Sequence, residues 1–321
     1  MVVVETGESL RILVTGSGGV IGRSVVAALA ALGHSVVSFD RNRPGPTTAP
    51  VPADDIREPS SVRSALKGVD GVIHLAAVSR AGPAELDPWT AHSVNVEGTR
   101  VLVESLRASG SSPWLIFASS REVYGDPNGL PVGESHPIRP KGVYGRTKVE
   151  GERLVRAYGR HGAARAAILR LSNVYGDPDD YPERVVPSFV TAALSGKPLI
   201  VRGPQYMLDL LHRDDAVQAV VSAVNYLGSA SGDSVETINV ASGEGIRLGE
   251  LARRAVALTG SSSEIQEELP VSWTTSAYVG DISKAERLLS WRPSNDVDQG
   301  LRALIEDFRA RRRAMVPALS A

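Results

Sequence analysis

A tyrosine and a lysine four residues apart, Tyr144 and Lys148, lie at the start of a helical pattern over residues 144–161. On a helix, side chains at positions i and i+4 lie on the same face. A phenol has a reference pKa of about 10, and a neighbouring ammonium group favours its ionised form, so the pair can act as a base near neutral pH. Because this spacing is common in helices, the pair indicates a catalytic site only in combination with other motifs.

Hydroxyl and carboxyl side chains end an apolar run of the strand type in WLIFASSREVYG (114–125). Ser119 and Ser120 close the run, and Glu122 follows two residues later. If the segment stays extended, Ser120 and Glu122 point to one side and Arg121 to the other. Ser120 can then hydrogen-bond a reacting hydroxyl, and Glu122 can act as a general base. The alternative is that Glu122 is a solvated loop acid.

A glycine-rich turn, TGSGGVIG (15–22), joins a short apolar run to a helical pattern. Small residues at this point let the backbone approach a pyrophosphate, whose charge meets the unpaired N–H groups of the helix. Asp40 lies 24 residues after Gly16, where a carboxylate can accept both ribose hydroxyls and repel a 2′-phosphate. The turn therefore predicts a dinucleotide site that favours NAD, while Arg41 and Arg43 leave NADP as the alternative.

The elements that must position these residues alternate between strand and helix. Short apolar runs are followed by helical patterns such as 21–32, 94–109 and 144–161, which predicts an α/β fold with a Rossmann-type, doubly wound parallel sheet. Prolines break this rhythm after residue 173. We expect an NAD-binding domain from 1–172 plus 207–240, and a smaller C-terminal substrate-binding lobe from 173–206 plus 241–321. The predicted strands span 11–15, 35–40, 71–77, 114–120 and 166–172, and a further strand, a helix from about Asp214 and another strand follow within 208–240.

Composition excludes several other classes of function. The chain has no cysteine, which excludes disulfides and thiolate metal sites, and its six histidines do not occur in helical metal-binding pairs, so we expect no metal. Its 35 basic and 36 acidic residues give a net charge of -1, so we expect no nucleic-acid partner. No apolar run is long enough to cross a membrane, and the N-terminal residues are acidic rather than basic. These features predict a cytoplasmic protein without a membrane partner.

Taken together and in order, the motifs resemble those of extended short-chain dehydrogenases/reductases of the NAD-dependent epimerase/dehydratase type. The resemblance covers nearly the whole chain. The motifs that carry it are TGSGGVIG, Asp40, Asp55-Ile56, HLAA (74–77), Asn95 in NVEGT (95–99), SSREVYG, YGRTK, LSNVYG (171–176) and DISKAERLLSWRP (281–293).

The resemblance implies a tightly held NAD, a catalytic group, a nucleotide-sugar substrate and a possible homodimer through long helices. The implied catalytic residues are Ser120, Glu122, Tyr144 and Lys148. The implied cofactor-binding residues are Gly16, Gly19, Val20, Ile21, Gly22, Asp40, Arg41, Asp55, Ile56, Leu75, Ala76, Ala77, Ser79, Asn95, Tyr144 and Lys148. The implied substrate-binding residues are Ser120, Arg121, Asn173, Arg184, Val185, Arg202 and Tyr278.

Within the family, Glu122 favours a dehydratase, because a carboxylate at this position can remove the proton at C5 once C4 is a ketone. In 4,6-dehydratases an aspartic acid stands where this chain has Arg121, and an arginine is a poor proton donor. The pattern resembles the UDP-N-acetylglucosamine 5,6-dehydratase type of tunicamycin (antibiotic) biosynthesis, and this resemblance implies that hydride returns to C4 and leaves a 5,6-ene. The alternatives are a 4,6-dehydratase, a 4-epimerase or decarboxylase, a non-nucleotide substrate such as a hydroxy-lactone, and a regulatory NAD-sensing protein.

Two departures from the family pattern concern the substrate diphosphate. Leu208 replaces an arginine that commonly pairs with the diphosphate, and VSWT (271–274) replaces a second basic motif. Arg184 or Arg202 can supply the lost charge. A UDP-hexosamine remains the favoured substrate.

Overall fold

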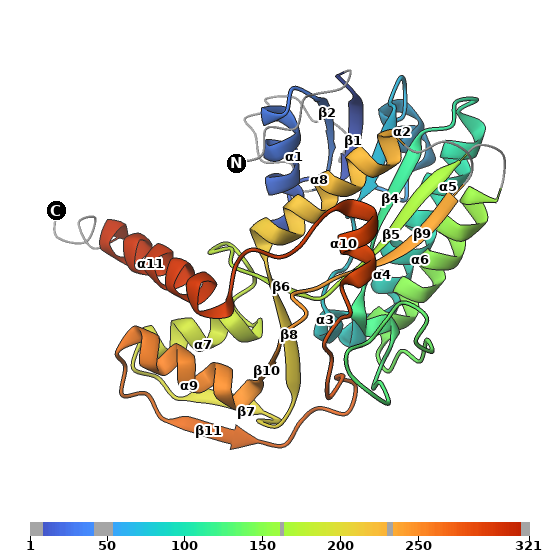
Figure 1. The fold of residues 1–321 in the computed structure, drawn as a ribbon. Coiled ribbons are helices and arrows are strands. Elements are labelled where there is room, and N and C mark those ends of the chain that lie inside the picture. Colours follow the sequence, from blue (N-terminus) through green and yellow to red (C-terminus); the bar gives the residue numbers. More distant parts are fainter. Residues whose placement is uncertain (1–8, 42–53, 161–163, 230–233, 316–321) are drawn as a thin grey trace.

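The computed structural model describes residues 9–41, 54–160, 164–229 and 234–315, and its centre is a six-stranded parallel sheet (Figure 1). The strand order is β2-β1-β3-β4-β5-β9, so the chain moves outward in both directions from the β1/β3 pair. This order confirms the α/β fold of the Rossmann type that the alternating pattern predicts. The strands are β1 (Arg11–Thr15), β2 (Ser35–Phe39), β3 (Gly71–His74), β4 (Trp114–Ser120), β5 (Arg165–Leu171) and β9 (Ser234–Val240).

Helices cover both faces of this sheet because the side chains of its strands alternate between two apolar cores. One core joins Ile12 and Ile116 to α1 (Val20–Ala31), α8 (Arg213–Ser229) and α10 (Ser283–Leu289). The other joins Leu13 and Leu115 to α2 (Pro59–Ala65), α5 (Gly98–Ala108) and α6 (Val143–Gly159). Three short helices, α3 (Ala81–Leu86), α4 (Pro88–His92) and η1 (Ser93–Glu97), lead from β3 into α5.

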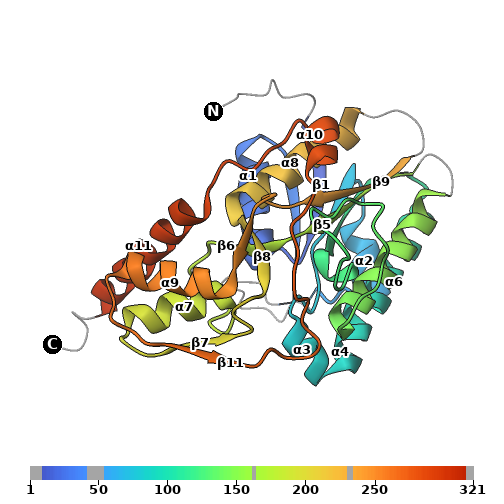
Figure 2. The same ribbon diagram turned by 60° about the horizontal axis from the view of Figure 1, so that its bottom comes forward.

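A smaller lobe, visible at the lower left of Figure 1 and again in Figure 2, has its own apolar core. It contains a three-stranded sheet of β6 (Asn173–Tyr175), β8 (Met207–His212) and β10 (Gly245–Arg247). A pair of parallel strands, β7 (Leu199–Arg202) and β11 (Ile265–Glu268), lies at its outer side. The helices of the lobe are α7 (Val185–Leu194), α9 (Leu248–Thr259) and α11 (Val297–Met315).

The polypeptide passes between the larger part and the smaller lobe more often than the proposed domain boundaries allow. β9 joins the central sheet as the prediction for 208–240 requires, but β8 does not, because it pairs with β6 and β10 instead. The helix α10, which follows the lobe in sequence, packs on α8 and β9. In the part of the chain that the structure describes, no helix is both long and apolar enough to span a bilayer.

Candidate active site

A cavity of about 850 Å³ lies outside the carboxyl ends of the central strands and is lined by three groups of residues. We call them the cofactor wall (16, 18–23, 39–41, 54–56 and 75–83), the catalytic wall (118–122, 144 and 148) and the lobe wall (171–175, 179–181, 183–187, 210, 273 and 274). The first two come from the larger part of the molecule, and most of the third comes from the smaller lobe. The cavity therefore brings residues from both parts to one site.

The glycine-rich turn in the cofactor wall has no room for a side chain at Gly16 or Gly22. Gly16 has a φ of +72°, and a Cβ there would lie 2.6 Å from the backbone nitrogen of Ala76. A Cβ on Gly22 would lie 2.0 Å from the carbonyl oxygen of Gly16. Asp40 follows β2 and accepts a hydrogen bond of 2.9 Å from the backbone N–H of Gly18. The start of α1 is thus open to a ligand, with a carboxylate beside it.

Other residues expected to bind the cofactor occupy the same wall. Asp55 forms an ion pair with Arg57, and the side-chain hydrogen bond with Arg57 lowers the pKa of Asp55 despite its partial burial. Arg43 lies outside the described residues. The predicted residues that line the cavity here are Gly16, Gly19, Val20, Ile21, Gly22, Asp40, Arg41, Asp55, Ile56, Leu75, Ala76, Ala77 and Ser79.

Asn95, which we expect to bind the cofactor, is not among the residues that line the cavity. It is 2% exposed, and its amide oxygen accepts the N–H of Val78 at 2.7 Å while its amide nitrogen donates to the carbonyl of Val78 at 3.1 Å. The amide nitrogen also donates to Thr147 at 3.0 Å. Asn95 therefore supports the cofactor wall from behind and connects it to α6.

The catalytic wall brings together Ser120 at the end of β4 and Tyr144 and Lys148 on α6. Burial raises the pKa of Tyr144 to about 12, while the charge of Arg184 and the neighbouring Ser120 hydroxyl oppose this rise. The Lys148 Nζ lies 5.8 Å from the Tyr144 ring centroid and donates to the Ala118 carbonyl at 2.8 Å. Burial lowers the pKa of Lys148 to about 8.

Glu122 also lines the cavity, although the backbone before it is not extended. Residues Arg121–Val123 form a 3-10 turn, η2, in which the Ser120 hydroxyl accepts the N–H of Glu122 at 3.2 Å. This local capping bond explains why the expected alternation of side chains ends at Ser120. One oxygen of Glu122 pairs with Arg121 at 2.8 Å, and the other accepts the hydroxyl of Thr275 at 3.0 Å.

Two supporting residues were missed by the sequence analysis. Glu152 lies four residues after Lys148 on α6, so its position on the same helix face was a usable local signal. It is 4% exposed, accepts the hydroxyl of Ser119 at 2.6 Å and pairs with Arg170 at 2.8 Å. Thr275 is 153 residues from Glu122 in the sequence, and no local pattern points to their contact.

The lobe wall contains three of the expected substrate-binding residues, Asn173, Arg184 and Val185. The Asn173 side-chain oxygen accepts a hydrogen bond of 3.1 Å from Nε of Arg121, an expected substrate-binding residue in the catalytic wall.

Two other expected substrate-binding residues lie elsewhere. Arg202 is on the outer strand β7, where it forms an ion pair of 2.8 Å with Glu268 of β11. Tyr278 is fully buried and stacks on Tyr124 behind the wall, with ring centroids 5.9 Å apart. Neither is among the residues that line the cavity. Leu208 is 9% exposed and belongs to the apolar core of the lobe.

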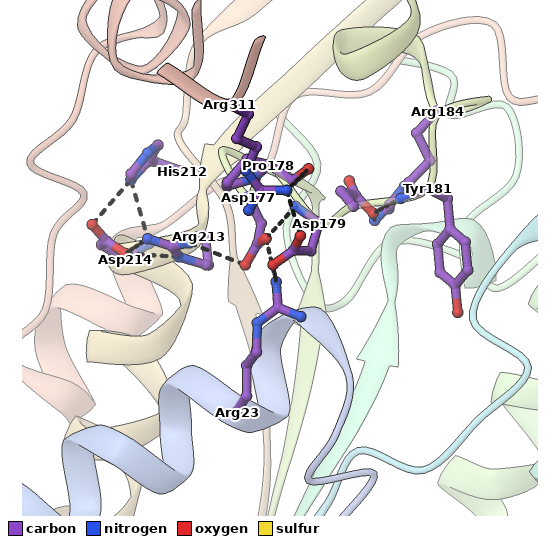
Figure 3. A network of polar contacts seen from close by, with 11 residues as sticks. Arg23, Asp177, Pro178, Asp179, Tyr181, Arg184, His212, Arg213, Asp214 and Arg311 are labelled. Atoms are coloured by element: carbon purple, nitrogen blue, oxygen red, sulfur yellow. Dashed lines mark hydrogen bonds and ion pairs between the residues drawn. The ribbon is translucent and has the colours of Figure 1, made fainter. Parts of the chain in front are cut away.

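An ionic network anchors the loop between β6 and α7, which ends at Arg184 (Figure 3). Its centre is Asp177, whose side chain is 1% exposed and pairs with Arg23 of α1 and, at 3.0 Å, with Arg213 of α8. The more exposed Asp179 pairs with Arg23 and with Arg311 of α11. The network therefore connects α1, α8 and α11 to the lobe wall.

Comparisons with known proteins agree with this geometry. Residues 12–241 match the model of the NAD dependent epimerase/dehydratase family. A putative UDP-glucose 4-epimerase of Methanocaldococcus jannaschii is 30% identical over 303 residues, which cover 92% of this chain and 97% of that protein. The structure of MoeE5 in complex with UDP-glucuronic acid and NAD is 28% identical, with a TM-score of 0.84 over 94% of this chain and 99% of that chain. DesIV, a dTDP-glucose 4,6-dehydratase from Streptomyces venezuelae with NAD bound, is 28% identical, with a TM-score of 0.83 over 94% and 98% of the two chains.

Proposed function

The chain belongs to the NAD-dependent epimerase/dehydratase family, and from this premise we propose that it is a nucleotide-sugar dehydratase. In the proposed reaction the C4 hydroxyl of the sugar is oxidised transiently, Glu122 removes the proton at C5, and the C6 hydroxyl is lost. The hydride then returns to the sugar. The observation that carries this proposal is the carboxylate of Glu122, which lines the same cavity as Ser120, Tyr144 and Lys148.

The cofactor wall fits a dinucleotide. The absence of space for a Cβ at Gly16 and Gly22 leaves the backbone bare where a pyrophosphate approaches the start of α1. Asp40, Asp55 and Ile56 line the cavity, and we assign Asp40 to the adenosine ribose and the other two to the adenine edge. NAD, when bound, supplies a reversible hydride acceptor, so the sugar is oxidised and reduced within one turnover.

Tyr144 is the residue that we assign to hold the proton of the C4 hydroxyl. Its pKa of about 12 means that the phenol is protonated at neutral pH in the protein alone, so it needs help to act as a base. Lys148, with a pKa of about 8, is mostly charged at pH 7 and supplies positive charge on the same helix face. Ser120 lines the cavity with Tyr144, and we assign it to orient the reacting hydroxyl.

Glu122 is the residue that we assign to the loss of water. A ketone at C4 makes the C5 proton acidic, and the electron pair of the C5–H bond can form a C5–C6 double bond as the C6–O bond breaks. The proton from C5 and the departing hydroxide together make up the water. Arg121 stands beside Glu122 and is always charged, so it cannot donate a proton. We therefore expect the hydride to return to C4, which gives a 5,6-ene without a ketone.

A 4-epimerase is the second candidate. The relative from Methanocaldococcus jannaschii carries that name, and for such a reaction Glu122 has no proton to remove. The name of DesIV likewise favours an ordinary 4,6-dehydratase as a variant of the first candidate. The presence of both Tyr144 and Lys148 in the cavity supports an enzyme over an NAD-sensing protein.

We propose the substrate only as a class, a nucleotide sugar, whereas we propose the reaction in detail. MoeE5 was solved with UDP-glucuronic acid, which supports a nucleotide sugar here. The choice of UDP-N-acetylglucosamine and the assembly of two copies stay predictions from the sequence resemblance.

The proposal can be tested by incubating the purified protein with a panel of UDP- and dTDP-hexoses and analysing the products by mass spectrometry and NMR. We expect a product lighter by one water that has a 5,6 double bond and no ketone. A 4-keto product with a C6 methyl group would mean a 4,6-dehydratase. A product of unchanged mass would mean an epimerase.

The variant Glu122→Gln sharpens this test because it keeps the shape of the side chain and removes its basicity. Water loss and exchange of the C5 proton in D₂O should both stop, while reduction of the bound NAD by substrate continues. Glu150→Gln is the matched control, because Glu150 lies on α6 with its side chain 44% exposed and pairs with His92. Full activity of Glu122→Gln would exclude the proposed role of Glu122.

A further inference from the structure

The two carboxylate oxygens of Glu122 have partners of different kinds. Oε1 pairs with Nη2 of Arg121 at 2.8 Å, whereas Oε2 accepts the hydroxyl of Thr275 at 3.0 Å. A nearby positive charge favours the ionised form of a carboxylate, so an oxygen held by a guanidinium is a poor acceptor for a further proton. Each carboxylate oxygen has two lone pairs, and Thr275 uses only one of those on Oε2. Oε2 is therefore the oxygen that can take a proton.

The ion pair between Glu122 and Arg121 has only one bond, although a second donor is at hand. Arginine and carboxylate groups frequently form two parallel bonds. Nη1 of Arg121 is buried and, among the described residues, has no hydrogen-bond partner, while Nε donates to Asn173 at 3.1 Å. An unpaired buried donor costs free energy, so a pair that uses both Nη1 and Nη2 is a competing arrangement. The bond from Thr275 to Oε2 opposes it.

The segment on either side of Thr275 is anchored. Ser276 donates its backbone N–H and its hydroxyl to Oδ1 of Asp126, at 2.7 and 2.8 Å. Lys141 donates to the carbonyl of Thr274 at 2.9 Å and to Asp126 at 2.8 Å. Thr275 itself is 2% exposed. Because both of its neighbours are tied to the same carboxylate–lysine pair, the hydroxyl of Thr275 is held in place.

Thr275 lies behind the catalytic wall. Glu122 and Arg121 line the cavity, but Thr275 is not among the residues that do. Within the described ranges, Glu122 is the only hydrogen-bond partner of its side chain. Any influence of Thr275 on the reaction must therefore pass through Glu122.

We infer that Thr275 is a positioning residue, which holds Oε2 of Glu122 away from Arg121 and leaves it free to take the C5 proton. The inference rests on the proposed function for the role of Glu122. Without the Thr275 hydroxyl, the carboxylate turns until Nη1 and Nη2 of Arg121 bind both of its oxygens. Neither oxygen is then a good proton acceptor.

The same arrangement gives the proton a path. When the C5–H bond breaks, the proton moves to Oε2, and the electron pair forms the C5–C6 double bond as the C6–O bond breaks. A hydroxyl can both donate and accept, so Thr275 can accept a hydrogen bond from the protonated oxygen. The departing hydroxide takes this proton and leaves as water, which returns Glu122 to its ionised form.

The test follows three steps in the NAD-loaded protein, with the nucleotide sugar of the panel that the unchanged protein converts fastest. Thr275→Val keeps the branched shape and removes the hydroxyl. Exchange of the C5 proton in D₂O and loss of water should both slow about 10- to 100-fold, the value of a hydrogen bond to a charged group. Reduction of NAD by the substrate should change little, because it precedes the step at C5.

Two further variants control for the change of side chain. Thr275→Ser keeps the hydroxyl and should restore both rates to nearly those of the unchanged protein. Thr259→Val makes the same substitution at a hydroxyl that donates to carbonyl groups of its own helix, α9, and should leave all three steps unchanged. Failure of Thr275→Ser to restore C5 exchange would assign the effect to packing and overturn the inference.

A double variant separates positioning from a general loss of structure. Arg121→Lys keeps a charge beside Glu122 but lacks the planar fork, so it cannot form two parallel bonds. In that background Thr275→Val should slow C5 exchange by no more than about threefold, because the competing pair is no longer available. An equally large loss in both backgrounds would show that the two residues act independently, contrary to the inference.

The position of the carboxylate can also be observed directly. A crystal structure of Thr275→Val should show both oxygens of Glu122 within hydrogen-bond distance of the Arg121 guanidinium. Thermal unfolding checks that each variant is folded, and Thr275→Ala carries the same expectations if the valine variant is not. A folded variant in which Glu122 keeps its single bond to Arg121 would overturn the inference.

These outcomes are separate from those that test the reaction. If the unchanged protein exchanges no C5 proton with any nucleotide sugar of the panel, the dehydratase proposal fails and the role of Thr275 fails with it. If the unchanged protein does exchange this proton and Thr275→Val exchanges it equally fast, only the assignment of Thr275 fails.

Discussion

The cofactor wall and the lobe wall are held by different forces. The cofactor wall depends on backbone packing, since no Cβ fits at Gly16 or Gly22 and the turn closes through the bond from the Gly16 N–H to the Phe39 carbonyl at 2.8 Å. The lobe wall depends on side-chain ion pairs, centred on Asp177 and including the long pair between Arg184 and Asp180.

This difference has a functional consequence. Close backbone packing leaves little freedom, so the cofactor wall is preformed for a ligand that stays bound through the reaction. In these ion pairs the carboxylates are buried but the arginines are partly exposed, so the guanidinium groups are the adaptable part of a wall that must bind and release a charged substrate. The catalytic wall lies in the same cavity and must contact both the retained cofactor and the exchanging substrate.

The largest effect is expected where neither wall is altered. Tyr144→Phe removes a single oxygen from the catalytic wall, and turnover should fall about 10²- to 10⁴-fold because general-base catalysis is lost. The affinities for NAD and for UDP should change little, since the variant loses only the phenol oxygen and keeps the ring. Steady-state kinetics and binding measurements on the same preparation check this. Activity within a few-fold of the unchanged protein would remove Tyr144 from the proposed mechanism.

The two walls also differ in how far the sequence could predict them. The glycine turn, Asp40 and the Tyr144–Lys148 spacing are local patterns, and the structure places all of them in the cavity. The family and the fold could be predicted for the same reason, since both depend on motifs in order and on the alternation of elements.

The lobe wall depends on contacts between distant residues, which local patterns do not report. Arg202 had the right charge but lies on an outer strand, and Tyr278 packs behind the wall. The contact of Thr275 with Glu122 and that of Asp177 with Arg23 join segments more than 150 residues apart. Their partners are fixed only once the lobe has folded.

The pH dependence of stability tests how far the Lys148 ammonium group in the catalytic wall is shielded from water. Its pKa falls from the usual 10.5 to about 8 through burial, so between pH 8 and 10.5 the folded protein has released a proton that the unfolded chain still holds. Stability should therefore rise with pH across this window, by about 3 kcal/mol in total. Below pH 8 the full cost of burying the charge remains.

The measurement is denaturant unfolding of the protein and of Lys148→Met at several values between pH 7 and 10.5. Other groups titrate in this range in both proteins, so the difference between them isolates Lys148. A constant difference across the window would show that Lys148 is well solvated. The catalytic wall would then be no better shielded from water than the partly exposed arginines of the lobe wall.

Asp177 tests the ionic network of the lobe wall. Asp177→Asn removes a buried carboxylate that pairs with Arg23 and Arg213, and the free energy of unfolding should fall by about 2–3 kcal/mol. The loss is smaller than for a fully buried pair because both arginines are partly exposed. Asp179→Asn is the control: its side chain is 53% exposed and should cost about 0–1 kcal/mol. Equal losses for the two variants would mean that the network has no buried centre.

The smallest effect is expected at the outer part of the cofactor wall. If the carboxylate of Asp40 repels a 2′-phosphate, Asp40→Asn should reduce the preference for NAD over NADP by roughly tenfold, or about 1.4 kcal/mol, and keep the acceptor for the Gly18 N–H. Asp55→Asn is the matched control, because the charge of Asp55 is already balanced by Arg57 and should matter less. Dissociation constants of both cofactors at low and high salt decide the point. The shift at Asp40 should shrink as salt screens a partly exposed charge, and a shift that persists in high salt, or is equal at Asp55, would assign the preference to shape rather than to charge.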